Sequence, residues 1–124
     1  MKARDIMTKD LVRVESDATI AWVISKMKHF RIRSLIVERA SEDEPYGIIT
    51  VRDAVYKVIA TGLDPKMVKV GEIKSEPAIC VSPDTDVRDV AKFMAEKNLS
   101  RVLICTEGKG VTGIASLFDV LKAF

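Results

Sequence analysis

The chain has 124 residues, the size of one compact domain, and 48% of them are hydrophobic. Its 20 basic and 18 acidic residues give a net charge of +2, which excludes an acidic tail and a strongly basic nucleic-acid arm. The apolar content excludes a disordered chain. The N-terminal residues lack the apolar run of a signal peptide, and no stretch approaches the roughly 18 apolar residues of a membrane span, so we expect a cytoplasmic protein.

In chain order, the first predicted element is a strand over 11–14, followed by a helix-start signal at Asp17. The helix presents one apolar face at i, i+3, i+4 and i+7, formed by Ile20, Val23, Ile24 and Met27. Residues 35–37 predict a buried strand, and a further strand begins at Gly47. A last helix carries Val51, Ala54, Val55 and Val58. Gly62 is well placed to end it.

The same series then returns, shifted by 67 residues at first and by 66 after the polar stretch 39–46. Asp84 repeats Asp17, and Asp119 repeats Asp53. The repeated strands are 78–81, 102–104 and one that begins at Gly113. The repeated apolar helix positions are Val87, Val90, Ala91 and Met94, and then Leu117, Val120, Leu121 and Phe124. Each copy is therefore predicted as β-α-β-β-α, which makes the fold class α/β.

The repeat predicts the domain organisation. We expect a first repeat over 1–62, a linker over 63–72 and a second repeat over 73–124. A unit of about 60 residues is marginally stable alone, because it buries a small share of its surface. The two repeats are therefore expected to pack as one module.

Two segments carry the chemistry, 47–53 and 113–119, and both read Gly-apolar-apolar-hydroxyl-x-x-Asp where a strand gives way to a helix. A hydroxyl beside the amides of a helix start suits a phosphate. A carboxylate three residues later can accept hydrogen bonds from two sugar hydroxyls. The same pattern fits a capping box, with Thr50 as the cap and Asp53 in the first turn. Both interpretations stay open, because a duplicated cap would give the same sequence.

From Lys2 to Phe124 the chain resembles a tandem pair of cystathionine-β-synthase-type (CBS) domains, a Bateman module. The resemblance is carried by the segments at Ile6 and Ile73, the helix starts at Asp17 and Asp84, the strand at 35–37 and the two Gly-to-Asp motifs. The family usually has a proline inside that strand, where this chain has Ile36 and Leu103. The resemblance implies two repeats related by pseudo-twofold symmetry.

The resemblance further implies a non-catalytic regulatory module whose two clefts bind adenosine-containing ligands such as AMP, ADP or ATP. In the first cleft Thr50 would contact phosphate and Asp53 ribose. The other residues implied there are Ile48, Ile79 and Leu99 around the adenine base, with Ser75 and Ser100 as polar neighbours.

In the second cleft Ser116 would contact phosphate and Asp119 ribose. The resemblance places Val12, Ile32 and Ile114 around the adenine base. It implies Thr8 as a polar contact, and Arg33 and Arg101 as phosphate contacts. The alternative for both arginines is a solvated side chain or a salt-bridge partner. An adenine nucleotide would be a regulatory ligand, and no cofactor is obligatory.

Other residue types favour no further chemistry. His29 is the single histidine, so no metal-ligand spacing and no nucleophile–histidine arrangement occurs, and we expect neither a metal site nor an enzyme. Cys80 and Cys105 are flanked by apolar residues, which favours buried, reduced thiols over a disulfide. Trp22 and Phe93 lie off the apolar faces of their helices and indicate a homodimer contact, unless loops cover them.

The leading hypothesis is thus a sensor that passes ligand occupancy to an unidentified regulated protein. The alternative is a structural dimerisation module with vestigial clefts. Nucleic-acid binding is disfavoured because the charges are evenly spread, with 11 basic and 9 acidic residues in 1–62 and 9 of each in 63–124.

Overall fold

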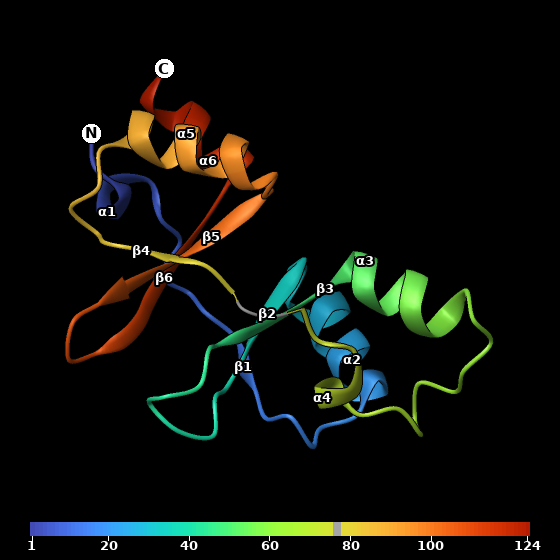
Figure 1. Cartoon of the computed structure of the whole chain (residues 1–124). Helices are drawn as coiled ribbons and strands as arrows, with labels where there is room; N and C mark the ends of the chain where they lie inside the picture. The colour runs from blue at the N-terminus through green and yellow to red at the C-terminus, as the bar shows by residue number, and fades with distance from the viewer. Residues whose placement is uncertain (76–77) are drawn as a thin grey trace. The chain divides into compact units, whose positions relative to one another are not determined.

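The computed structural model describes residues 1–75 and 78–124 and holds two three-stranded sheets with helices around them (Figure 1). The predicted α/β class is confirmed. The chain divides into two compact units. The first-sheet unit is Val12–Ala78, and the second-sheet unit combines Met1–Leu11 with Ile79–Phe124.

The first-sheet unit has the strand order β1-β2-β3, with β1 parallel and β3 antiparallel to β2. Its elements are β1 (Arg13–Val14), α2 (Ile20–Phe30), β2 (Ser34–Val37), β3 (Gly47–Thr50), α3 (Val51–Asp53), the π-helix η1 (Ala54–Ile59) and α4 (Val70–Ile73). Thr19 caps α2 by accepting a hydrogen bond from the Trp22 amide. The helix ends at Arg31, whose φ of 55° is left-handed. Gly62, with a φ of +78°, follows η1 as predicted.

The core of this unit confirms the predicted apolar faces of α2 and β2. The fully or nearly buried side chains include Ile20, Val23, Met27, Leu35, Val37 and Ile49. The helix after β3 fits its prediction only in part. Ala54 and Val58 are buried, whereas Val51 and Val55 are about 40% exposed. Two of its four apolar positions therefore remain on the surface.

The second-sheet unit repeats this plan with the strand order β4-β5-β6. Its elements are α1 (Ala3–Ile6), β4 (Cys80–Val81), α5 (Val87–Lys97), β5 (Arg101–Thr106), β6 (Gly110–Ser116), α6 (Leu117–Val120) and the 3-10 helix η2 (Leu121–Ala123). The strand β6 begins three residues before the predicted Gly113. The hairpin between β5 and β6 closes tightly, because Gly108 and Gly110 adopt positive φ, and the register shifts between Ile104 and Cys105.

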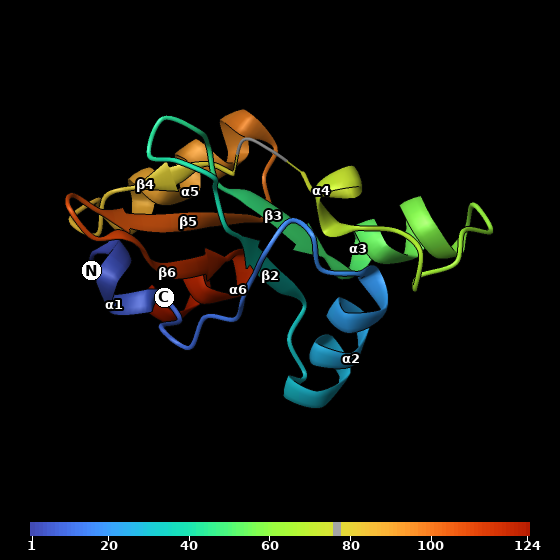
Figure 2. The same cartoon turned by 90° about the horizontal axis from the view of Figure 1, so that it is seen from below.

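The 67-residue shift relates α1 (Ala3–Ile6) to α4 (Val70–Ile73), so the second repeat begins with α4, inside the predicted linker, and each of these two leading segments packs in the unit that holds the other repeat's sheet. The Ala3 amide donates to the Thr85 carbonyl at 2.8 Å, so that α1 lies beside α5 and β6 (Figures 1 and 2). In the same way, the Val70 amide donates to the Ala18 carbonyl at 2.8 Å. The residues 63–72 therefore pack with the first-sheet unit, and α1 with the second-sheet unit.

The two positions where the family usually has proline make hydrogen bonds that proline could not make. The Ile36 amide donates to the Val12 carbonyl at 3.0 Å, and the Leu103 amide donates to the Ile79 carbonyl at 2.8 Å. Each bond holds a two-residue edge strand, β1 or β4, against the central strand of its sheet.

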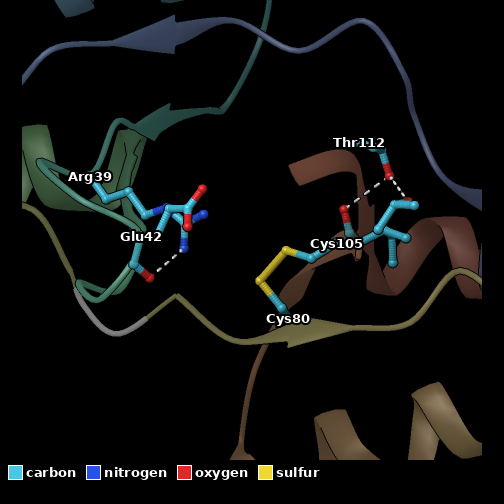
Figure 3. The surroundings of a disulfide bond; sticks show 7 residues. Arg39, Glu42, Cys80, Cys105 and Thr112 are labelled. Carbon is cyan, nitrogen blue, oxygen red and sulfur yellow. Dashed lines mark hydrogen bonds between the residues drawn. A yellow bond between two sulfur atoms is a disulfide. The ribbon is translucent and has the colours of Figure 1, made fainter. Parts of the chain in front are cut away.

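The two cysteines form a disulfide between β4 and β5, so the expectation of buried, reduced thiols is wrong (Figure 3). Their Cα atoms lie 5.6 Å apart, within the range for a disulfide. Side chains alternate along a strand, and Val81 and Ile104 pack with the core. Their neighbours Cys80 and Cys105 therefore face away from it, and Cys80 is exposed.

Candidate functional site

Both Gly-to-Asp motifs span the end of a strand and the start of a helix, and both form capping boxes. Thr50 accepts a hydrogen bond from the Asp53 amide at 3.1 Å, and Asp53 Oδ2 accepts one from the Thr50 amide at 3.0 Å. Ser116 and Asp119 form the matching pair at 3.3 and 2.8 Å. The capping interpretation is confirmed in both copies, and it occupies one carboxylate oxygen of each aspartate.

The Asp53 cluster consists of Ile48, Thr50, Asp53, Lys57 and Ser75. The oxygen Asp53 Oδ2 accepts from the amide and the hydroxyl of Thr50, both at 3.0 Å. The oxygen Oδ1 accepts from Ser75 Oγ at 3.2 Å and lies 3.0 Å from Lys57 Nζ. Ser75 is held there by backbone hydrogen bonds with Ile48. Three hydrogen bonds and one ion pair thus engage both carboxylate oxygens, and the Asp53 residue is 6% exposed.

The Asp119 cluster consists of Thr8, Ile114, Ser116, Asp119 and Lys122. Asp119 Oδ2 accepts from the Ser116 amide and hydroxyl, at 2.8 and 3.0 Å. The oxygen Oδ1 contacts Lys122 Nζ at 2.8 Å and has no second donor among the described residues. Thr8 pairs with Ile114 through its backbone, as Ser75 does with Ile48. The Asp119 side chain is 14% exposed, against 8% for that of Asp53, and Oδ1 of Asp119 keeps an acceptor position that no described residue fills.

The charge of Asp119 is stabilised within the fold. Burial raises the pKa of this carboxyl group, but hydrogen bonds from Lys122 and Ser116 and the charge of Lys122 lower it, and the pKa lies below its ordinary value of 3.8. Ionised Asp119 therefore stabilises the native state. This contribution is present above the unfolded-state pKa and is lost as the pH falls through the lower native-state pKa.

We predict that Asp119→Asn is less stable than the parent protein at neutral pH and that the difference shrinks below about pH 4. The asparagine cannot carry the charge that Lys122 faces, whereas protonation removes the same charge from the parent at low pH. Urea unfolding between pH 3 and pH 7 measures this difference. The control is Asp43→Asn in the exposed loop before β3, and an Asp119→Asn difference that is constant with pH would contradict the prediction.

The predicted cleft residues are divided between the two units. Of the first cleft, Ile48, Thr50, Asp53 and Ser75 meet in the Asp53 cluster, and Ile79, Leu99 and Ser100 belong to the second-sheet unit. Of the second cleft, Thr8, Ile114, Ser116 and Asp119 meet in the Asp119 cluster with Arg101 in the same unit, and Val12, Ile32 and Arg33 belong to the first-sheet unit. The assignment of these residues to shared clefts stays a prediction.

The residues predicted to contact the adenine base share one degree of burial. All six predicted base contacts are half-buried, namely Val12, Ile32, Ile48, Ile79, Leu99 and Ile114. They keep apolar surface that a flat base can cover. Arg33 is exposed, and its carbonyl accepts from the Val51 amide at 3.0 Å.

The sequence reasoning missed the two lysines. Lys57 follows Asp53 by four residues and Lys122 follows Asp119 by three, which are the spacings of side-chain pairs on a helix. Each lysine also donates to the backbone carbonyl at the end of a leading segment, Lys57 to Ile73 of α4 and Lys122 to Ile6 of α1. The lysines therefore tie the motif to the segment packed against it.

The two aromatic residues predicted for a contact surface differ. Trp22 is 40% exposed, with Lys26 Nζ 5.2 Å from its ring centroid. Phe93 is half-buried against the core of the second-sheet unit, so the prediction that it leaves the apolar face is wrong.

The described residues contain no group of three potential metal ligands. No helix in 1–75 or 78–124 is long and apolar enough to cross a membrane.

Comparisons with known proteins agree with this architecture. A family model described as CBS domain matches twice, at residues 3–60 and 70–124. An uncharacterized protein of Methanopyrus kandleri is 31% identical over 118 residues, which are 95% of this chain and 60% of that protein. The hexameric CBS-CP12 protein from bloom-forming cyanobacteria has a TM-score of 0.90 and 40% identity, over 98% of this chain and 66% of that one.

A third similar structure is the cytosolic domain of the Mg2+ channel MgtE in complex with ATP. It has a TM-score of 0.78 and 25% identity, over 99% of this chain and 48% of that one. The chain thus spans between about half and two thirds of the length of the three proteins it resembles.

Proposed function

The chain belongs to the CBS-domain family as a tandem pair, and from this premise we propose that it is a non-catalytic regulatory module that binds adenosine-containing ligands. The observation that carries the proposal is the Asp119 carboxylate, which keeps an acceptor position that no described residue fills, beside the Ser116 cap. A ribose presents hydroxyl donors, and one of them can donate to this position. The similar MgtE domain in its ATP complex supports the class of ligand.

In this proposal the two clusters differ in how readily they accept a ligand. Asp119 can accept a ribose hydroxyl on Oδ1 while Lys122 stays in place. A ligand at Asp53 must compete with Ser75 or Lys57, because both already contact Oδ1. The ligand therefore occupies the Asp119 cluster at lower concentration than the Asp53 cluster. Arg101, in the same unit as Asp119, is the basic residue that we assign to the phosphate.

The proposal predicts that at least one ligand of a panel of AMP, ADP, ATP, S-adenosylmethionine and NADH binds the intact chain. Titration calorimetry measures the binding, and circular dichroism shows that the sample is folded. Because the clusters differ, we expect a tighter and a weaker binding step, or only one step. Absence of binding for every ligand, with folded protein, contradicts the proposal.

A second candidate function is a dimerisation module, and apolar exposure on the helices after β3 and β6 favours it. The exposed large apolar residues there include Val55, Tyr56, Ile59, Leu117, Phe118, Leu121 and Phe124. Phe118 is 78% exposed, and an apolar hollow of about 540 Å³ lies between α5 and α6. The similar CBS-CP12 protein is a hexamer. If no ligand of the panel binds, a homodimer through these helices and Trp22 is the function that we propose instead.

The regulated partner of the sensor is an unidentified protein in this proposal, and a cytoplasmic location is also part of it. A ligand changes the output of such a module only through different affinities for two of its states.

A further inference from the structure

We propose that the Cys80–Cys105 disulfide is a reversible thiol–disulfide exchange site, which takes a dithiol reductant as its substrate and sets how firmly β4 is held to β5. The proposal does not depend on a bound nucleotide. It concerns the second-sheet unit alone.

The sequence repeat shows that the disulfide occupies a position with a counterpart in the first-sheet unit. The shift of 67 residues that relates the repeats places Arg13 at the position of Cys80 and Glu38 at that of Cys105. Arg13 and Glu38 form an ion pair, with 3.0 Å between the guanidinium nitrogen and the carboxylate oxygen. Each repeat therefore has a side-chain link across the same two parallel strands, ionic between β1 and β2 and covalent between β4 and β5.

The strand β4 depends more on its side-chain link than β1 does, because its residues are less buried. Val14 in β1 is 4% exposed and belongs to the core of its unit. In β4 both residues lack such burial, because Cys80 is exposed and Val81 is only half-buried. Besides the ladder of two residue pairs, β4 is held by the Leu103 amide, which donates to the Ile79 carbonyl. Reduction therefore weakens the pairing of β4 more than loss of the ion pair weakens β1.

The disulfide is also open to attack. Cys80 is exposed, and Cys105 is half-buried beside a register shift in β5, where the ladder is already interrupted. Exchange requires that a thiolate reach one of the two sulfur atoms. The edge position of β4 leaves one side of that strand without a neighbouring strand among those described.

A dithiol reduces the disulfide in two displacement steps. One thiolate of the dithiol attacks a sulfur of the protein disulfide, the Cys80–Cys105 bond breaks, and a mixed disulfide forms. The second thiol of the reductant then displaces the remaining protein sulfur. Two electrons and two protons pass to the protein, which gains two thiols, and the reductant leaves as its own disulfide.

The test uses the intact chain and dithiothreitol as the dithiol. We expect native-state alkylation to label both cysteines after reduction. Hydrogen exchange at the Leu103 amide should then become about 10- to 100-fold faster, because the loop closed by the disulfide, with a sequence separation of 25, is released. The Ile36 amide is the internal control, since the ion pair beside it does not respond to a reductant. No labelling without denaturant, or unchanged Leu103 exchange after reduction, would overturn the proposal.

The chain supplies a matched variant. The double substitution Cys80→Arg and Cys105→Glu transfers the ion pair of the first-sheet unit to the second. We expect Leu103 exchange in this variant to be the same with and without dithiothreitol. If the variant does not fold, the comparison of Leu103 with Ile36 in the parent protein decides the matter alone. Exchange at Leu103 that responds to dithiothreitol in the variant as in the parent would overturn the proposal.

Discussion

Replacing Asp119 with alanine will weaken adenosine-ligand binding by about 10- to 100-fold, because the hydrogen bond from a ribose hydroxyl to the charged Oδ1 is lost. The same change at Asp53 will act mainly on stability. The Asp53 carboxylate accepts three hydrogen bonds inside the fold, from Thr50 and Ser75, and forms an ion pair with Lys57. Asp53→Ala leaves these donors without an acceptor and removes the N3 half of the capping box, although the N-cap Thr50 remains, and this costs about 2–3 kcal/mol.

Two measurements on the same samples separate these effects. Titration calorimetry with the tightest ligand of the panel gives the affinity, and urea unfolding gives the free energy of unfolding. Asp43→Ala in the exposed loop is the control and should change neither. If Asp53→Ala abolishes the tighter binding step and Asp119→Ala retains it, the assignment of the ligand to the Asp119 cluster is wrong.

The difference between the two clusters could not be predicted from the motifs, which match at every defining position. It arises from residues outside them. Ser75 lies 22 residues after Asp53 and reaches it because its backbone pairs with Ile48. Thr8 occupies the equivalent place beside Ile114 and makes no hydrogen bond to Asp119. A contact between distant segments depends on their packing, so local periodicity does not reveal it.

The elements themselves were predictable where local pattern determines them. The faces of α2 and α5 and the buried strand β2 follow from periodicity. The disulfide was missed because apolar neighbours of a cysteine do not show which strand lies beside it. Alternation along a strand places Cys80 opposite to the core-packed Val81, but this holds only once β4 is known to be a strand.

The second large predicted effect concerns α1 and α4, the leading segments that are swapped between the two repeats. Ile6 is 1% exposed and Val70 is fully buried, and each packs in the unit of the other repeat. Ile6→Ala should therefore cost about 2–5 kcal/mol, and Val70→Ala about 2 kcal/mol, through lost burial and the cavity that remains. We expect Ile6→Ala to speed hydrogen exchange in β5 and β6, and Val70→Ala to speed it in β2 and β3.

This reciprocal pattern shows whether the leading segments are swapped between the repeats, because sequence order alone assigns Ile6 to the repeat that contains β2 and β3. Lys9→Ala, an exposed change near the end of the same segment, is the matched control and should alter exchange in neither sheet. Faster exchange in β2 and β3 after Ile6→Ala, with β5 and β6 unaffected, would show that each repeat keeps its own leading segment. If the predicted pattern is found, each sheet depends on residues from both repeats. Neither repeat cut out at its sequence boundary would then contain a complete unit.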